Sequence, residues 1–193
     1  TDTISDSIIV APLPQVGFLS DSVCFGGITS FTDTTIDFGY SIVSWEWDFG
    51  DGNSSNIQNP QNNYGDSGQY IVQLIAGNAS GCFDTTQLIA YVKPNPTAGY
   101  TFTNVCFGDT MTFTDMSSPN SSSMFSWEYD FGDGQNSMAS NPSHLYANPG
   151  MYNVQQIVTN SWMCSDTATQ SVEVYALPDA GFMASVACIR FPT

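Results

Sequence analysis

The chain has 193 residues, of which 41% are apolar and 13% aromatic, enough to build a packed core and too many for a disordered chain. It carries 18 acidic residues against 2 basic ones, and this net charge of −16 argues against nucleic acid or anionic membrane as a partner, because phosphate binding needs clustered Lys and Arg. No apolar run is long enough to span a bilayer, so membrane insertion is not expected.

The sequence repeats itself at a constant interval. Cys24, Cys106 and Cys188 are spaced by this interval (106 − 24 = 82 and 188 − 106 = 82), and Trp45 maps onto Trp127. The chain is therefore expected to be a window of a longer array, and its short Pro-bearing links favour stiff head-to-tail joints. The register predicts four segments: the last strand of one repeat (1–12), two complete domains (13–94 and 95–176) and the first strand of another repeat (177–193).

Strand patterns dominate both repeats. Alternating apolar residues over 70–76 and 152–158 predict strands, and Phe31 and Phe113 are expected to point inward from between threonines. Short strands at regular spacing, separated by Gly, Pro, Asn and Asp, are typical of an antiparallel sandwich. The expected fold class is therefore all-β, with sandwiches in tandem.

Each complete repeat contains two cysteines, and their spacing is the same in both repeats (82 − 24 = 58 and 164 − 106 = 58). This equal spacing favours the disulfides Cys24–Cys82 and Cys106–Cys164, which would tie the first strand of each domain to the start of its last strand. Closing so long a loop contributes about 4 kcal/mol in the chain-entropy treatment, and such bridges imply an oxidising compartment and hence export. The alternative is free core thiols. Cys188 is expected to be unpaired within the chain.

The stretch SWEWDFGDG (44–52) recurs as SWEYDFGDG (126–134). On a strand the aromatic side chains of this motif share one face and the acids share the other, so the motif predicts a buried aromatic strand that runs into a tight turn. The residues expected to shape this strand and turn are Trp45, Trp47, Asp48, Asp51 and Gly52 in the first repeat, and Trp127, Tyr129, Asp130, Asp133 and Gly134 in the second.

The acids of the motif leave two other roles to consider. Catalysis would need two carboxylates facing one cavity, whereas Asp48 and Asp51 fall at a strand end and in a turn, so the chain is not expected to be an enzyme. Calcium is the other alternative, since it needs several converging oxygens. Its candidate ligands are Asp48, Asp51, Asp130 and Asp133. The sole histidine, His144, is expected to be an ordinary turn residue.

The motif is followed by Asn-Pro and then by Tyr-x-x-x-Gly-x-Tyr (64–70), and together they resemble the hallmark of the PKD (polycystic kidney disease) domain family. The second repeat departs from that hallmark in having Tyr129 where the family has Trp. The resemblance implies an immunoglobulin-like β-sandwich with extracellular work in stalks, adhesins or accessory modules beside secreted hydrolases. Arrays of this kind with cysteines also resemble the giant surface and adhesion proteins of Gram-negative gliding bacteria, which implies a bacterial cell-surface location.

The triplet of Asp, then Ser or Thr, then Ala, Ile, Leu, Val, Met or Thr resembles the O-glycosylation signal of exported proteins in that bacterial group. The alternative is that Asp-Thr is ordinary turn and strand-edge chemistry. The triplet gives seven candidate sites: Thr3, Ser7, Ser22, Thr34, Thr85, Thr110 and Thr167. Matches to the N-linked signal are ranked lower, because they count only if the source glycosylates Asn, and they fall at Asn53, Asn78 and Asn120.

Two functions follow as hypotheses. The first is a structural segment of a long extracellular repeat protein, a stalk, surface filament or adhesin backbone, whose partners are other copies or repeats of itself, head-to-tail or lateral. The second is an accessory module of a secreted enzyme that binds carbohydrate or protein, with Tyr40, Phe83 or Trp162 as a stacking platform unless these rings pack in the core. No cofactor is expected apart from the calcium alternative and covalent glycans.

Overall fold

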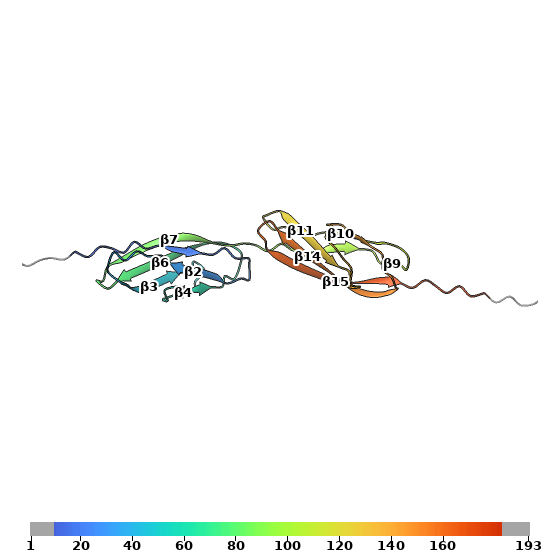
Figure 1. Cartoon of the computed structure of the whole chain (residues 1–193), viewed down its shortest axis with the longest axis horizontal. Coiled ribbons are helices and arrows are strands. Elements are labelled where there is room, and N and C mark those ends of the chain that lie inside the picture. The colour runs from blue at the N-terminus through green and yellow to red at the C-terminus, as the bar shows by residue number, and fades with distance from the viewer. Residues whose placement is uncertain (1–9, 183–193) are drawn as a thin grey trace, which may run out of the picture. The chain divides into compact units, whose positions relative to one another are not determined.

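The computed structural model describes residues 10–182, and all regular structure in that stretch is β (Figure 1). None of the residues in this range forms a helix that could cross a membrane. The strands of the first repeat are β1 (Phe18–Ser20), β2 (Thr29–Asp33), β3 (Ile42–Asp48), β4 (Ser54–Ser55), β5 (Gln61–Asn62), β6 (Gly68–Asn78) and β7 (Phe83–Val92). Those of the second are β8 (Tyr100–Phe102), β9 (Val105–Cys106), β10 (Met111–Asp115), β11 (Met124–Asp130), β12 (Asn136–Ser137), β13 (Ser143–His144), β14 (Gly150–Asn160) and β15 (Ser165–Tyr175).

The first repeat packs a three-stranded sheet, β1-β2-β5, against a four-stranded sheet, β4-β3-β6-β7. The long antiparallel pair β6–β7 runs in unbroken register from Gly68 opposite Val92 to Gly77 opposite Phe83. Inward-facing residues of both sheets fill the core, which confirms the alternation expected over 70–76. The buried core residues are Phe18, Phe31, Trp47, Phe49, Tyr64, Val72, Leu74, Ala90 and Val92.

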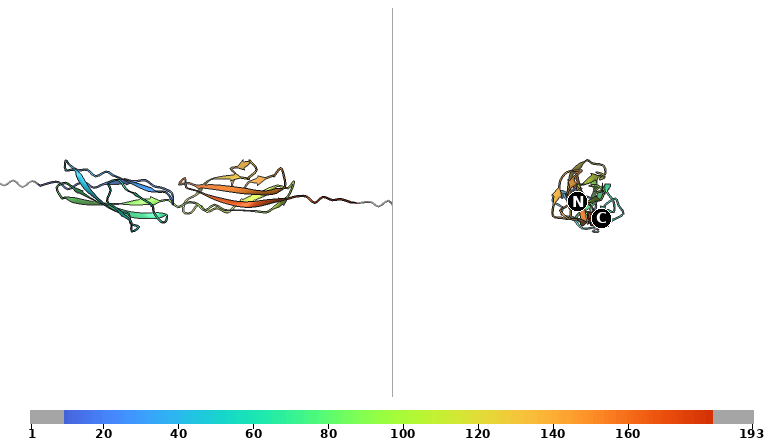
Figure 2. Two further views of the ribbon diagram at one scale, coloured as in Figure 1. Left: turned by 90° about the horizontal axis from the view of Figure 1, so that it is seen from below. Right: turned by 90° about the vertical axis from the view of Figure 1, so that its right-hand side faces the viewer.

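The second repeat has the same plan, with sheets β13-β10-β8 and β12-β11-β14-β15-β9. The short strand β9 pairs in parallel with the end of β15, so that Cys106 lies opposite Tyr175. In the first repeat a single parallel bridge, Cys24 opposite Lys93, takes the place of that pairing. The two sheets of each repeat face each other across a core (Figure 2). The all-β sandwich fold expected from the sequence is confirmed.

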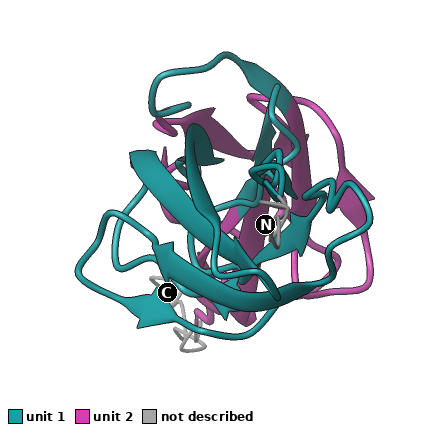
Figure 3. Ribbon diagram, turned by 90° about the vertical axis from the view of Figure 1, so that its left-hand side faces the viewer, with its two compact units in different colours: residues 1–96, 119–125, 159–165 teal, residues 97–118, 126–158, 166–193 magenta. Residues whose placement is uncertain are grey.

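The contacts between residues divide the protein into two compact units (Figure 3). Unit 1 holds the chain up to residue 96 together with 119–125 and 159–165, and unit 2 holds 97–118, 126–158 and the chain from 166 onward. The two short segments in unit 1 come from the second repeat: one leads into β11, and the other contains the β14–β15 turn. Compact unit 1 is therefore larger than the first repeat.

The disulfide pairing expected within each repeat is wrong. Cys24 is bonded to Cys164, with 5.6 Å between their Cα atoms and 140 residues between them in sequence, and both belong to unit 1. Cys82 and Cys106 are free thiols. Cys188 lies outside the described residues.

The topology of the last strand explains this correction. Cys24 lies opposite Lys93, at the end of β7, whereas Cys82 stands immediately before the start of β7. Eleven residues (93 − 82) separate these two points. At about 3.3 Å per residue they are roughly 35 Å apart, far beyond the separation of about 4.4–6.8 Å that a disulfide allows between its Cα atoms.

Candidate functional site

The acid–aromatic motif forms a buried strand, as predicted. Trp47 is fully buried (0% exposed) and Phe49 is also in the core, while Glu46 and Asp48 face solvent. Tyr129 and Phe131 take the corresponding core positions in the second repeat. Trp45 and Trp127 are partly buried and pack against the edges of the two cores.

The motif then enters the expected tight turn. Gly50 and Gly52 have φ of 76° and 90°, a conformation that L side chains adopt only with strain. Asp48 Oδ1 accepts a hydrogen bond from the Gly50 N–H (2.9 Å), which closes the first part of the turn. Gly50 also crosses β6 closely, because a Cβ at this position would lie 2.5 Å from Ile71 O. Its lack of a side chain therefore has both a conformational and a steric reason.

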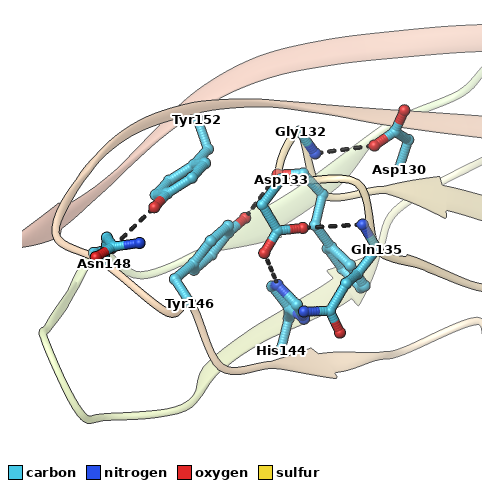
Figure 4. Close-up of polar contacts among 9 residues, drawn as sticks. Asp130, Gly132, Asp133, Gln135, His144, Tyr146, Asn148 and Tyr152 are labelled. Atoms are coloured by element: carbon cyan, nitrogen blue, oxygen red, sulfur yellow. Dashed lines mark hydrogen bonds and ion pairs between the residues drawn. The ribbon is translucent and has the colours of Figure 1, made fainter.

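The last acid of the motif holds the turn to a neighbouring strand. In the first repeat Asp51 Oδ2 accepts hydrogen bonds from Asn62 Nδ2 (2.8 Å) and Asn53 Nδ2 (3.0 Å). In the second repeat Asp133 Oδ2 accepts from His144 Nε2 (2.8 Å) instead (Figure 4). These carboxylates therefore bind the protein's own turn to β5 and β13.

His144 is more than the ordinary turn residue expected from the sequence. It belongs to β13, is only 7% exposed, and its ring stacks on Phe131 with 4.1 Å between centroids and 3° between planes. Only the comparison with its repeat partner Asn62 could have indicated this role, because both side chains supply a nitrogen to the same carboxylate position.

Two stacked tyrosines in each repeat close the same end of the core. The Tyr64 hydroxyl donates to Phe49 O (3.2 Å) and its ring stacks on Tyr70, with 4.0 Å between centroids. Tyr146 repeats the arrangement with a bond to Phe131 O of 3.1 Å (Figure 4). Burial raises the pKa of Tyr64 to about 12 from its ordinary value of 10.0, so the phenol is a neutral donor in the folded protein.

An aspartate at the end of β2 anchors the first tryptophan, a role that the sequence reasoning missed. Asp33 Oδ2 accepts from Trp45 Nε1 (2.7 Å). In the second repeat Asp115 Oδ2 accepts from Trp127 Nε1 (2.8 Å). Burial by itself raises the pKa of Asp33, but hydrogen bonds from Thr35, Trp45 and Gln58 outweigh it and lower the pKa. The available signal was the recurrence of Phe-Thr-Asp at the repeat interval.

The departure from the family hallmark at Tyr129 is matched by a second change in the core. Gln156 is completely buried, and its Nε2 donates to the Tyr129 hydroxyl and to Asp115 Oδ1, both at 2.8 Å. In the first repeat the aligned residues are Trp47 and Leu74, an apolar pair apart from the indole N–H, which donates to Ile57 O (3.0 Å). A smaller phenol in place of the indole is thus accompanied by a polar partner that satisfies its hydroxyl.

The outward acids of the motif border a shallow hollow in each repeat. Glu46 and Asp48 line one of about 300 Å³, and Glu128 and Asp130 line its smaller counterpart of about 120 Å³. Within residues 10–182 no group of three or more His, Cys, Asp or Glu side chains is arranged to hold a metal ion. All four suggested calcium ligands accept a backbone hydrogen bond within the turn, and calcium binding by them stays a prediction.

Five of the O-glycosylation candidates are solvent-exposed, and two, Thr3 and Ser7, lie outside the described residues. The exposed ones are Ser22, Thr34, Thr85, Thr110 and Thr167. The N-linked candidate Asn78 lies buried at the end of β6. It is 2% exposed, and its amide nitrogen donates to Pro12 O (3.1 Å) while its oxygen accepts from the Cys82 N–H (3.1 Å).

The other two N-linked candidates also use their amide nitrogens. Asn53 is exposed, but its Nδ2 donates to Asp51, and Asn120 Nδ2 donates to Asn95 O (2.9 Å). Of the three suggested stacking rings, Phe83 is 59% exposed, Tyr40 is half-buried, and Trp162 packs edge-on against a neighbouring tyrosine.

Comparison with known proteins agrees with this geometry. The profile of the PKD domain family matches twice, at residues 10–93 and 91–175. Collagenase ColA of Bacillus cereus is 30% identical over 83 residues, a stretch that covers 43% of this chain and 8% of the collagenase.

Two solved structures each match about one repeat. The PKD1 domain of Vibrio anguillarum Epp is 27% identical, with a TM-score of 0.42, over 44% of this chain and 99% of that one. The PKD1 domain of the Vibrio cholerae metalloprotease PrtV is 28% identical, with a TM-score of 0.40, over 42% and 98%. With the family profile matched over both repeats, the chain belongs to the PKD domain family, and its two complete repeats are tandem PKD domains.

Proposed function

We propose that the chain is a structural segment of an extracellular repeat protein, working as a stalk, surface filament or adhesin backbone. The observation that carries this proposal is the Cys24–Cys164 disulfide, which joins residues of two consecutive PKD repeats. A bond of this kind lets tension pass from Cys24 directly to Cys164, so that the residues between them do not bear it. Disulfides persist in oxidising compartments, which supports an extracellular, cell-surface location.

Neighbouring repeats would be linked head-to-tail, and copies of the protein would associate laterally in a filament. The exposed Ser22, Thr34, Thr85, Thr110 and Thr167 are offered as O-glycan attachment points that keep such a surface soluble. Intact-mass measurement of native material tests the glycans, because a mass equal to that of the bare sequence removes them from the proposal.

Electron microscopy of the native protein tests the structural role. A thread of regularly spaced beads that extends from the cell surface is the expected result. A compact particle in which one or two PKD repeats adjoin a large enzyme would contradict it and favour the second candidate.

That second candidate is an accessory module of a secreted enzyme that binds carbohydrate or protein. It is favoured by Phe83, which together with Trp45 and Ile75 lines a hollow of about 180 Å³, and by the relative that is a collagenase. Aromatic faces stack on sugar rings. Binding to polysaccharides and to collagen, compared between the unchanged chain and Phe83→Ala, measures this function.

The matched control is Phe125→Ala, because Phe125 is similarly exposed (63%, against 59% for Phe83) and does not line that hollow. Loss of binding with Phe83→Ala alone supports the accessory role. Equal binding by both variants and the unchanged chain contradicts the assignment to this hollow.

A further inference from the structure

We propose that Cys82 and Cys106 are attachment sites for disulfides to further PKD repeats. We call Cys24 and Cys106 the first-position cysteines, and Cys82 and Cys164 the second-position cysteines, from their order in each repeat. The disulfide present in this chain joins a first-position cysteine to the second-position cysteine of the next repeat. The proposal extends this rule to the two free thiols and rests on the structural function above, since it needs an array.

The two first-position cysteines have the same backbone setting. The N–H that follows Cys24 donates to Lys93 O (2.8 Å), and the N–H that follows Cys106 donates to Tyr175 O (2.8 Å). Each cysteine is thereby fixed to the end of the last strand of its repeat, where the chain leaves toward the next repeat. Cys106 therefore occupies the position from which Cys24 reaches Cys164.

The two second-position cysteines are also equivalent. The Cys164 N–H donates to Asn160 Oδ1 (3.1 Å), and the Cys82 N–H donates to Asn78 Oδ1 (3.1 Å). Both close the turn before the last strand of their repeat, β15 in one case and β7 in the other. Cys82 therefore presents its thiol in the same turn that presents the bonded Cys164.

The chain that enters each repeat is held in the same way, and this independent observation extends the equivalence to the segment before each repeat. Asn160 Nδ2 donates to Pro94 O (3.1 Å), just after the last strand of the first repeat. Asn78 Nδ2 donates to Pro12 O at the same distance of 3.1 Å. A repeat that precedes Pro12 as the first repeat precedes Pro94 would bring its first-position cysteine to Cys82.

Burial of the four thiols follows the same logic. The bonded Cys164 is 1% exposed, whereas its equivalent Cys82 is half-buried. The bonded Cys24 is half-buried, whereas its equivalent Cys106 is exposed. Each free thiol is more accessible than its bonded counterpart, which suits a group that another repeat would cover.

The reaction is a two-electron oxidation. The Cys106 thiol and a second-position thiol of another repeat lose two protons and two electrons and form one S–S bond. In the test below the electrons pass by thiol–disulfide exchange to oxidised glutathione, whose own S–S bond breaks to give two glutathione thiols. In an exporting cell a disulfide-donating oxidoreductase would serve as the oxidant.

The test extends the full chain after residue 176 with a second copy of residues 95–176, which supplies one further complete repeat. The protein is oxidised in a glutathione buffer, free thiols are alkylated, and the disulfides are mapped by proteolysis and mass spectrometry. We expect Cys106 to lose its alkylation and to be joined to the added copy of Cys164, 140 residues further on, as Cys24 is to Cys164. A matched extension in which the added copy of Cys164 is replaced by Ser should leave Cys106 alkylated.

A second arm uses the unextended chain at high concentration and separates the two sources of the partner thiol. Covalent dimers in which Cys106 of one copy is bonded to Cys82 of the other would show that another copy of the chain can supply the partner thiol. Dimers that link Cys106 to Cys106, or Cys82 to Cys82, would overturn the proposal, because they join like positions.

Three results of the first arm would also overturn it. They are full alkylation of Cys106 in the extended chain, a bond between Cys106 and Cys164 of its own repeat, and loss of the Cys24–Cys164 bond on which the rule depends. The proposed structural function is judged separately by microscopy, so a thread of beads with Cys106 still free would reject the inference alone.

Discussion

Reduction of the Cys24–Cys164 disulfide is expected to change how much length the chain releases when its two ends are pulled apart. In the oxidised chain the force passes from Cys24 directly to Cys164, and the residues between them lie outside the loaded path. Of the strands in the two repeats, only β1 (Phe18–Ser20) and β15 (Ser165–Tyr175) remain exposed to the load.

The magnitude follows from the 140-residue separation of the two cysteines. An extended chain spans about 3.5 Å per residue, so reduction should release roughly 490 Å of additional contour length. The pairing that the spacing alone favoured, with one closed loop inside each repeat (82 − 24 and 164 − 106), predicts instead about 200 Å for each repeat. The two pairings therefore differ by an amount that single-molecule pulling resolves easily.

The assay is force spectroscopy of the full chain held at both ends, with and without reductant. Cys24→Ser, measured with and without reductant, is the matched control, because it removes this bridge and should release the long segment in both conditions. Two successive unfolding events of about 80 residues each in the oxidised, unsubstituted chain would refute the reasoning, since they would place both sandwiches in the loaded path.

Three further predictions concern the motif and two residues that contact it. Gly50→Ala should lower the unfolding free energy by about 3 kcal/mol or more, because its Cβ would lie 2.5 Å from a β6 carbonyl oxygen. Gly52→Ala has open space around its Cβ and should lower the unfolding free energy by only about 1–2 kcal/mol, the cost of its positive φ; equal losses in denaturant titrations would contradict this difference. Burial raises the pKa of Asp33, but its hydrogen bonds outweigh burial and lower the pKa below the ordinary 3.8, so the stability that Asp33 contributes should be present above that pH and lost below it. Trp45→Phe removes one of these hydrogen bonds and should weaken the acid dependence of urea unfolding, whereas an unchanged dependence would argue against the Trp45–Asp33 bond. Burial raises the pKa of Tyr64 from 10.0 to about 12, so the stability that its neutral hydroxyl contributes should be complete below pH 10 and lost as the pH rises toward 12. Tyrosinate absorbance that develops fully near pH 10 while the chain is still folded would contradict this.

The parts of the fold that depend on local pattern could be predicted from the sequence. Trp47 and Phe49 alternate with Glu46 and Asp48, and a strand has only two faces, so the buried and exposed sets follow directly. The Gly residues of the turn were likewise predictable, because their spacing after a strand leaves few backbone conformations. Partners far apart in sequence were not predictable in this way: the bonds from Trp45 to Asp33 and from His144 to Asp133 depend on how strands pair.

The disulfide shows a different limit. Within one repeat, Cys24 and Cys82 are 58 residues apart (82 − 24 = 58). Cys24 and the equivalent of Cys82 in the next repeat, Cys164, are 140 residues apart, which is longer by one repeat interval. Spacing cannot choose between these two, because every repeat satisfies both. The choice is made by the direction of the last strand, which starts at Cys82 and ends beside Cys24. Only the three-dimensional pairing contains that direction.

The same strand direction connects the fold to the work of an array. A last strand that runs the length of the sandwich puts the first-position cysteine at the exit of its repeat and the second-position cysteine at the entrance. A bond within a repeat would have to cross the whole domain, whereas the bond that forms joins Cys24 to Cys164 of the next repeat. The Cys24–Cys164 bond thus links consecutive repeats, and each core relies on its aromatic strand and its Asp51 or Asp133 turn. In the proposed array the acid–aromatic motif keeps each bead folded, and the cysteines determine how much of each bead bears the load.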